Sequence, residues 1–105
     1  MDNLEQIAFQ IISYAGEAKS LLFEALKDAR EENFILAEDK VKQAESSILK
    51  AHESHFSLIQ KEASGDKVQV SLLLMHAEDQ LITVETIKSL TLELIEMNKK
   101  INSNS

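Results

Sequence analysis

Apolar side chains recur every three or four positions along almost the whole chain, which is the spacing of residues on one face of an α-helix. The sequence contains no proline and only two glycines among its 105 residues, so little in it would interrupt a helix. In the first segment the regularly spaced apolar residues are Leu4, Ile7, Ile11, Ala15, Ala18, Leu22, Ala25 and Ala29. This spacing predicts an all-α protein in which each helix buries one stripe in a shared core.

Two short polar segments divide the pattern into three helices. The first covers residues 30–34, which are charged and include Asn33, a residue that tolerates the left-handed backbone of a turn. The second covers residues 62–67, where Gly65 suits the left-handed end of one helix and Asp66 suits the N-cap of the next. We therefore predict helices at about residues 3–30, 34–63 and 67–101.

Long helices joined by short turns pack side by side with alternating direction. The second apolar stripe of the chain consists of Phe34, Ala37, Val41, Ala44, Ile48 and Ile59. A chain of 105 residues is one domain by its length. We expect a single domain over residues 1–105 that folds as an antiparallel up-down-up bundle of three helices.

The third predicted helix carries more apolar surface than one bundle can cover. On a helical wheel its narrow polar sector consists of Glu78, Glu85, Ser89 and Glu96. One apolar face consists of Leu73, Ala77, Leu81 and Val84, and a second face consists of Leu72, Met75, Ile82, Leu90 and Met97. Exposure of the second face would leave a large apolar patch, so we expect further copies of the chain to cover it.

Two polar residues lie on or beside this second apolar face. His76 lies at its edge, and a lone histidine on an apolar helix is more often structural than catalytic. Asp79 lies among the apolar residues, and an unpaired buried carboxylate costs several kcal/mol. Asp79 must therefore be protonated, hydrogen-bonded or neutralised by a cation. If three copies meet about an axis, three Asp79 carboxylates could share a hard cation such as Mg²⁺.

Charge and composition exclude several classes of protein. The net charge of -7 opposes binding to nucleic acid or to an anionic membrane surface. The absence of cysteine excludes disulfides and thiol chemistry and is compatible with a reducing cytosol. The longest purely apolar run, residues 72–75, is far too short to insert into a membrane, and Asp2 and Glu5 stand where a signal peptide would be basic. We therefore expect a cytoplasmic protein.

His52 and His55 are three residues apart, a spacing that could hold a transition metal on one helical face. No cysteine or acidic residue with matching spacing accompanies them, and the pattern differs from the HExxH pattern of zinc proteases. We therefore predict no metal site at this pair.

Three segments resemble, in order and spacing, the lactose/cellobiose-type enzyme IIA components of the bacterial sugar phosphotransferase system. They cover residues 14–26, 51–65 and 72–81, and the last, "LLLMHAEDQL", is similar to the active-site signature of the family. The resemblance implies a three-helix protomer in a nine-helix homotrimer. It also implies that His76 accepts a phosphoryl group from the phosphocarrier HPr and passes it to a cysteine of the cognate IIB component. In the family the aspartate that corresponds to Asp79 binds a metal on the trimer axis.

The chain departs from the family pattern at a few positions. Gln80 and Ile82 stand where relatives often have His and Met, and His55 and Phe56 stand where Gln and Thr are commoner. Gln80 follows His76 by one helical turn, so its amide could donate a hydrogen bond to phosphate or orient the imidazole ring. The phosphoacceptor itself is unchanged.

A neutral imidazole near its pKa of about 6.5 suits a phosphoryl relay, because it attacks phosphorus and then leaves readily. We assign Glu78 and Asp79 no phosphate contact, since negative charge near an arriving phosphate is unfavourable. Ala15 and Gly16 could let another helix approach His76 closely, or could serve helix packing alone. For transfer at His76, we expect His52 and His55 to be dispensable.

Two other functions remain as alternatives to a carrier subunit for the uptake of a β-linked disaccharide. One is a purely structural trimeric scaffold. The other is a histidine-phosphotransfer module of two-component signalling, which usually carries Lys and Gly where this chain has Asp79 and Gln80. Phosphorylation that depends on phosphoenolpyruvate, enzyme I and HPr distinguishes the carrier from both.

Overall fold

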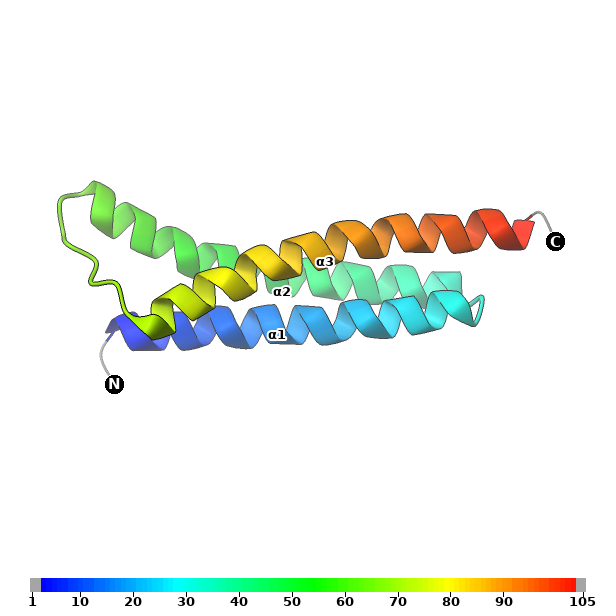
Figure 1. The fold of residues 1–105 in the computed structure, drawn as a ribbon, viewed down its shortest axis with the longest axis horizontal. Coiled ribbons are helices and arrows are strands. Elements are labelled where there is room, and N and C mark those ends of the chain that lie inside the picture. Colours follow the sequence, from blue (N-terminus) through cyan, green and yellow to red (C-terminus); the bar gives the residue numbers. More distant parts are fainter. Residues whose placement is uncertain (1–2, 104–105) are drawn as a thin grey trace.

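The computed structural model describes residues 3–103 and consists of three α-helices that lie side by side (Figure 1). Helix α1 spans Asn3–Arg30, α2 spans Phe34–Ala63 and α3 spans Leu72–Ser103. No residue in this part of the chain belongs to a β-strand, so the prediction of an all-α protein with three helices is confirmed. The molecule measures 58 × 23 × 19 Å. Within residues 3–103, no helix is long and apolar enough to cross a membrane.

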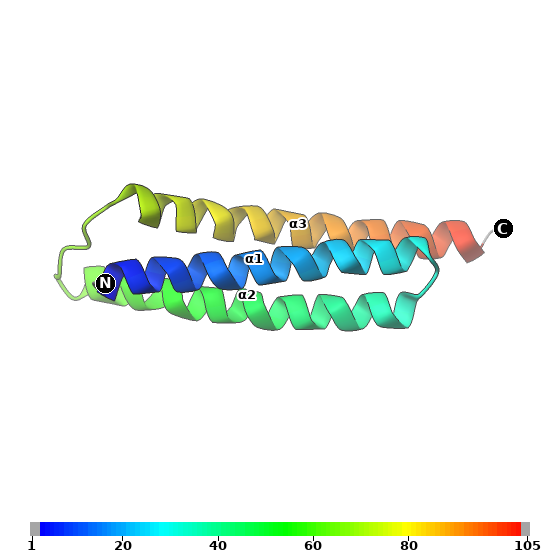
Figure 2. The same ribbon diagram turned by 90° about the horizontal axis from the view of Figure 1, so that it is seen from below.

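Helix α1 lies between the other two helices and contacts both (Figure 2). The turn from α1 to α2 lies at one end of the molecule, and the longer connection from α2 to α3 lies at the other end (Figure 1). Contacts between α2 and α3 are sparse by comparison. In both views the end of α2 and the start of α3 lie apart, joined by residues 64–71.

The core between α1 and α2 is built largely from alanine, which lets the two backbones approach closely. The buried residues of α1 are Ala8, Ile11, Ala15, Ala18, Leu22, Ala25 and Ala29, and those of α2 are Ala37, Val41, Ala44, Ser47, Ile48, Ala51 and Leu58. The stripe predicted for α1 is therefore confirmed in nearly all of its members. At the end of α2 the prediction was wrong, because Leu58 is buried and Ile59 is 50% exposed. Ile59 lines the space where α2 diverges from α3, so α3 does not cover it.

The turn between α1 and α2 closes by backbone hydrogen bonds. The N–H of Asn33 donates to the carbonyl of Asp28 at 2.9 Å, and the N–H of Glu32 donates to Ala29 at 3.1 Å, which together form a Schellman motif. The left-handed residue in this motif is Glu32, with φ 66°, whereas Asn33 has φ -90°. The turn lies where the sequence predicts it, but its left-handed position precedes Asn33 by one residue.

Helix α3 begins at Leu72, five residues later than the predicted start at Lys67. Ser71 precedes the helix, and its hydroxyl accepts a hydrogen bond from the N–H of Leu74 at 3.1 Å. Asp66 is therefore not the N-cap. Its N–H instead donates to Lys61 in the motif that ends α2, in which Gly65 has the predicted left-handed backbone with φ 99°. The intervening residues "VQVS" contain two β-branched valines, which have low helix propensity.

Candidate functional site

Helix α3 has two apolar faces, as the helical wheel predicts. One face packs in the core and includes Ala77, Leu81 and Val84, as predicted. At its start the prediction was wrong, because Leu74 is buried and Leu73 is only partly buried against the core. The opposite face is exposed on the single chain and includes Leu72, Met75, Ile82, Leu90 and Met97. These residues follow one side of the helix along most of its length. The apolar patch that they form is larger than scattered apolar residues on a protein surface would form.

His76 lies in the second turn of α3, and its side chain is exposed. At about 100° per residue, Asp79 lies about 60° from it around the helix on one side and Gln80 lies about 40° from it on the other side. Asp79 is exposed among the apolar residues of the second face, whereas Gln80 is half-buried. The helix thus presents the three predicted site residues as neighbours on one side.

A single protomer offers one Asp79 carboxylate. Within residues 3–103, no group of three or more histidine, aspartate or glutamate side chains is placed so that it could hold a metal ion. An axial site would need the Asp79 carboxylates of several copies.

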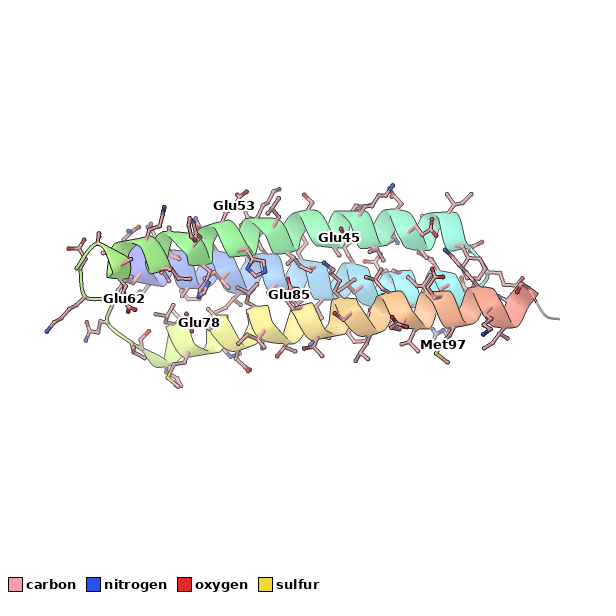
Figure 3. All side chains as sticks on the ribbon, turned by 90° about the horizontal axis from the view of Figure 1, so that it is seen from above. Glu45, Glu53, Glu62, Glu78, Glu85 and Met97 are labelled. Atoms are coloured by element: carbon pink, nitrogen blue, oxygen red, sulfur yellow. The ribbon has the colours of Figure 1, made fainter. Side chains whose placement is uncertain are left out.

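The two histidines of α2 form ion pairs that the sequence analysis did not predict. His55 Nε2 lies 2.8 Å from Glu78 Oε1, and His52 Nε2 lies 2.9 Å from Glu85 Oε1. Glu78 and Glu85 form part of the polar sector of α3, on the side that faces α2 (Figure 3). The two histidines are three residues apart and their glutamate partners are seven residues apart, so the spacing in the sequence gives no signal for these pairs. They become visible only when the register of the two helices is known.

Other contacts fix this register. Lys50 Nζ lies 5.7 Å from the centre of the Tyr14 ring, and Lys40 Nζ lies 3.1 Å from Glu24 Oε1. Together with the pairs between α2 and α3, these contacts place Gly16 within about one turn of Glu85, and therefore about 15 Å along the bundle from His76. Gly16 thus does not let α1 approach His76 within the protomer. A Cβ added at Gly16 would meet no atom within 4 Å.

Lys99 links the far end of α3 to α2 through Glu38, and it also contacts Glu96 on its own helix at 3.4 Å. The hydrogen bond to Glu38 raises the pKa of Lys99, and the same bond lowers the pKa of Glu38. Near the opposite end, His55 and Glu78 line a cavity of about 250 Å³ together with Met75 and Val70. Polar pairs therefore hold α2 to α3 at both ends of their contact.

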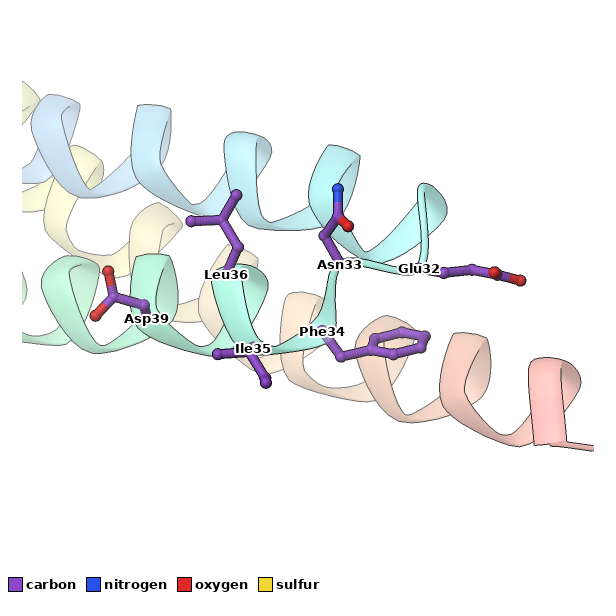
Figure 4. A pocket seen from close by; sticks show the side chains of 6 residues that line it. All are labelled: Glu32, Asn33, Phe34, Ile35, Leu36 and Asp39. Atoms are coloured by element: carbon purple, nitrogen blue, oxygen red, sulfur yellow. The ribbon is translucent and has the colours of Figure 1, made fainter.

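A larger hollow of about 890 Å³ lies at the turn between α1 and α2, at the opposite end of the molecule from the start of α3 (Figures 1 and 4). It is lined by Glu32, Asn33, Phe34, Ile35, Leu36 and Asp39. None of the predicted site residues lies in it. The candidate site is therefore the exposed surface of α3 around His76 and not this hollow.

Comparison with known proteins shows the family of the chain. Residues 6–99 match the family model of the lactose/cellobiose-specific IIA subunit of the PTS system. The chain is 42% identical over 94 residues to the lactose-specific EIIA component of Streptococcus mutans, which covers 90% of each chain. Its structure is similar to the cellobiose-specific enzyme IIA of Bacillus anthracis, with a TM-score of 0.97, 38% identity and coverage of 100% of this chain and 96% of the other.

A second solved structure that is similar to this chain is the IIA(chitobiose)–HPr complex of the N,N'-diacetylchitobiose branch of the Escherichia coli phosphotransferase system. The identity is 32%, the TM-score is 0.78, and the match covers 97% of this chain and 99% of the other. The family match includes His76, Asp79 and Gln80. The chain therefore belongs to the lactose/cellobiose-specific IIA subunits of the sugar phosphotransferase system.

Proposed function

We propose that the chain is the phosphoryl carrier of a cytoplasmic relay for sugar uptake, in which His76 accepts a phosphoryl group from phospho-HPr and passes it to a cysteine of the cognate IIB component. The observation that carries this proposal is the exposed position of His76 on α3, within the segment that the family model matches. A relative with the same fold is described in complex with HPr, which supports HPr as the donor. Two protein partners must reach His76 one after the other, and its exposed side chain allows this.

The reaction requires one nucleophile that is also a good leaving group. A ring nitrogen of His76 attacks phosphorus, and the bond from phosphorus to the donor breaks as the new bond to nitrogen forms. In the second transfer the thiolate of the IIB cysteine attacks, and the imidazole leaves as a neutral ring. Gln80 lies about one turn away and donates an amide hydrogen bond that orients the ring or the phosphoryl group.

The oligomer that we propose is a homotrimer of antiparallel three-helix bundles, with nine helices in all. The exposed apolar face of α3 is the surface that the other copies would cover. Asp79 lies on that face, so covering it would bury a carboxylate that needs compensation. Carboxylate oxygens are the donors that Mg²⁺ prefers, so three Asp79 side chains would hold such an ion on the axis. Bound there, the ion would offset the repulsion between the carboxylates.

The sugar is a β-linked disaccharide or a related β-glycoside. Lactose, cellobiose and N,N'-diacetylchitobiose are the sugars in the names of the similar proteins, and this chain contains no feature that selects among them. In such systems the membrane component IIC binds the sugar. The IIA chain would therefore contribute specificity only through its choice of IIB partner.

Substitution of the histidine tests the proposal. Incubated with phosphoenolpyruvate, enzyme I and HPr, the wild-type chain accepts one phosphoryl group, whereas His76→Ala and His76→Gln accept none. Both variants keep the helical circular dichroism spectrum, since the side chain is exposed. Stable phosphorylation of His76→Ala would refute the assignment, and absence of phosphorylation in the wild type would favour the structural scaffold.

A further inference from the structure

The first two turns of α3 carry His76 and are anchored to their own bundle by three apolar side chains. Leu74 and Ala77 are buried and Leu73 is partly buried against the core, whereas Leu72 is 84% exposed and Met75 is 58% exposed on the face that the proposed trimer would cover. Residues 64–71 lead into the helix without regular structure, and the end of α2 lies apart from the start of α3 (Figure 1). The first N–H groups of a helix also lack partners within it, so helix starts fray readily. The position of His76 therefore depends on whatever ties these turns to the rest of the bundle.

His55 makes a contact of this kind between α2 and the start of α3. Its ring lies 2.8 Å from Glu78, two residues after His76, and its side chain is only 24% exposed. In the part of the chain that the structure describes, this is the ion pair between α2 and α3 that lies nearest the start of α3. The carboxylate accepts, so the bond is donated by the ring nitrogen. The pair spans the cavity where the two helices diverge.

We infer that His55 is a positioning residue for phosphoryl transfer, which fixes the start of α3 and therefore His76 through its bond to Glu78. This replaces, for His55 alone, the expectation from the sequence that both histidines of α2 are dispensable for the transfer. This inference rests on the proposed function of His76. His55 does not touch the reacting atoms, because Glu78 lies about 160° around the helix from His76. It acts instead on the place and direction of the nucleophile, for which an error of about 1 Å can cost a large factor in rate.

The chain contains a matched control for this pair. His52 and Glu85 form the same kind of contact between the same two helices at 2.9 Å, but Glu85 lies nine residues beyond His76. Loss of either bond removes one partly exposed histidine–glutamate pair and should affect overall stability similarly. Only loss of the His55 bond should affect the start of α3.

The experiment measures the rate constant of transfer from phospho-HPr to His55→Ala, His52→Ala, His55→Gln and the double variant of His55→Ala with Glu78→Ala. We expect His55→Ala to lower the rate constant at saturating phospho-HPr about tenfold, with an unchanged half-saturating concentration. His52→Ala should stay within about twofold of the wild type. The Gln side chain keeps a donor for Glu78, so His55→Gln should recover most of the rate, and the double variant should be no slower than His55→Ala.

Equal rates for His55→Ala and His52→Ala would overturn the inference, as would a change in half-saturating concentration alone. Amide hydrogen exchange tests the same tie without any phosphoryl transfer. Exchange of residues 72–80 should quicken in His55→Ala and not in His52→Ala. If the wild type accepted no phosphoryl group, the proposed function would fail, and the exchange result would still decide whether His55 fixes the start of α3.

Discussion

Glu32 occupies a backbone position that glycine usually fills. It is the left-handed residue of the motif that ends α1, and its φ of 66° is the only positive value among the described residues other than glycine. The equivalent position at the end of α2 is Gly65. A side chain in this conformation costs about 1 kcal/mol relative to glycine. The packing of α1 against α2 therefore stabilises the turn by more than the left-handed backbone of Glu32 destabilises it.

Glu32→Gly should stabilise the protein by about 0.5 to 1 kcal/mol, because it relieves this cost. Urea unfolding followed by circular dichroism measures the change as a higher midpoint. The control is Glu31→Gly, one residue earlier in the same turn, where no left-handed backbone needs relief. A lower midpoint for Glu32→Gly would show that the Glu32 side chain stabilises the protein by more than its left-handed backbone destabilises it.

The helix ends and helix faces that depend on neighbouring residues in the chain are predicted by the sequence. The polar turn before Phe34 and the glycine at position 65 mark the ends of α1 and α2. The two faces of α3 follow from its periodicity. The start of α3 could not be predicted in the same way, because Asp66 and Ser71 are both good N-caps and the choice depends on how the connecting segment crosses between diverging helices.

The polar pairs between α2 and α3 could not be predicted because they depend on interhelical register. The spacing of His52 and His55 indicates only that both lie on one side of α2. Which glutamate each histidine contacts depends on the axial position of α2 relative to α3. For the same reason the sequence left open whether Gly16 adjoins His76 or serves helix packing alone, and the register places Gly16 and His76 about 15 Å apart.

The contact of Lys99 with Glu38 should make stability depend on pH on the acid side. Its hydrogen bond lowers the pKa of Glu38 in the folded state, so the stabilisation is present above the unfolded pKa of about 4.3 and is lost as the pH falls through the lower folded value. Glu38→Gln should therefore be less stable than the wild type at pH 7, and the difference should shrink below about pH 4.

Thermal unfolding of both proteins from pH 7 to pH 3 measures this difference. Glu53→Gln is the control, since Glu53 is exposed on the same helix and forms no ion pair within residues 3–103. A gap between wild type and Glu38→Gln that stayed constant with pH would show that the contact does not contribute in solution.

At the scale of the whole molecule, the single chain leaves one side of α3 without a partner. The large apolar side chains on that side include Leu72, Met75, Ile82, Leu90 and Met97, and the carboxylates of Asp79 and Glu93 lie among them. The same helix buries its opposite side in a core rich in alanine. A trimer would cover the exposed face and bring the Asp79 carboxylates together, which accounts for the position of Asp79 in a largely apolar surface.

Removal of a divalent cation should destabilise the wild type and not Asp79→Asn. A carboxamide keeps the shape of the side chain but binds a hard cation less strongly, and it removes the repulsion between the copies. Sedimentation equilibrium should show a trimer for both proteins, and a chelator should lower the melting temperature of the wild type alone. A monomer at micromolar concentrations would contradict the trimer, and an identical response to chelator would leave a protonated carboxylate as the better account of Asp79.

Whether His76 carries the phosphoryl group is tested most directly by locating that group on the wild-type chain. The protein is phosphorylated with phosphoenolpyruvate, enzyme I and HPr, and the product is analysed by ³¹P NMR and by fragmentation of its peptides. We expect one phosphoryl group per chain, bound to nitrogen and carried by His76. A phosphoryl group on His52, on His55 or on a hydroxyl side chain would contradict the assignment to His76.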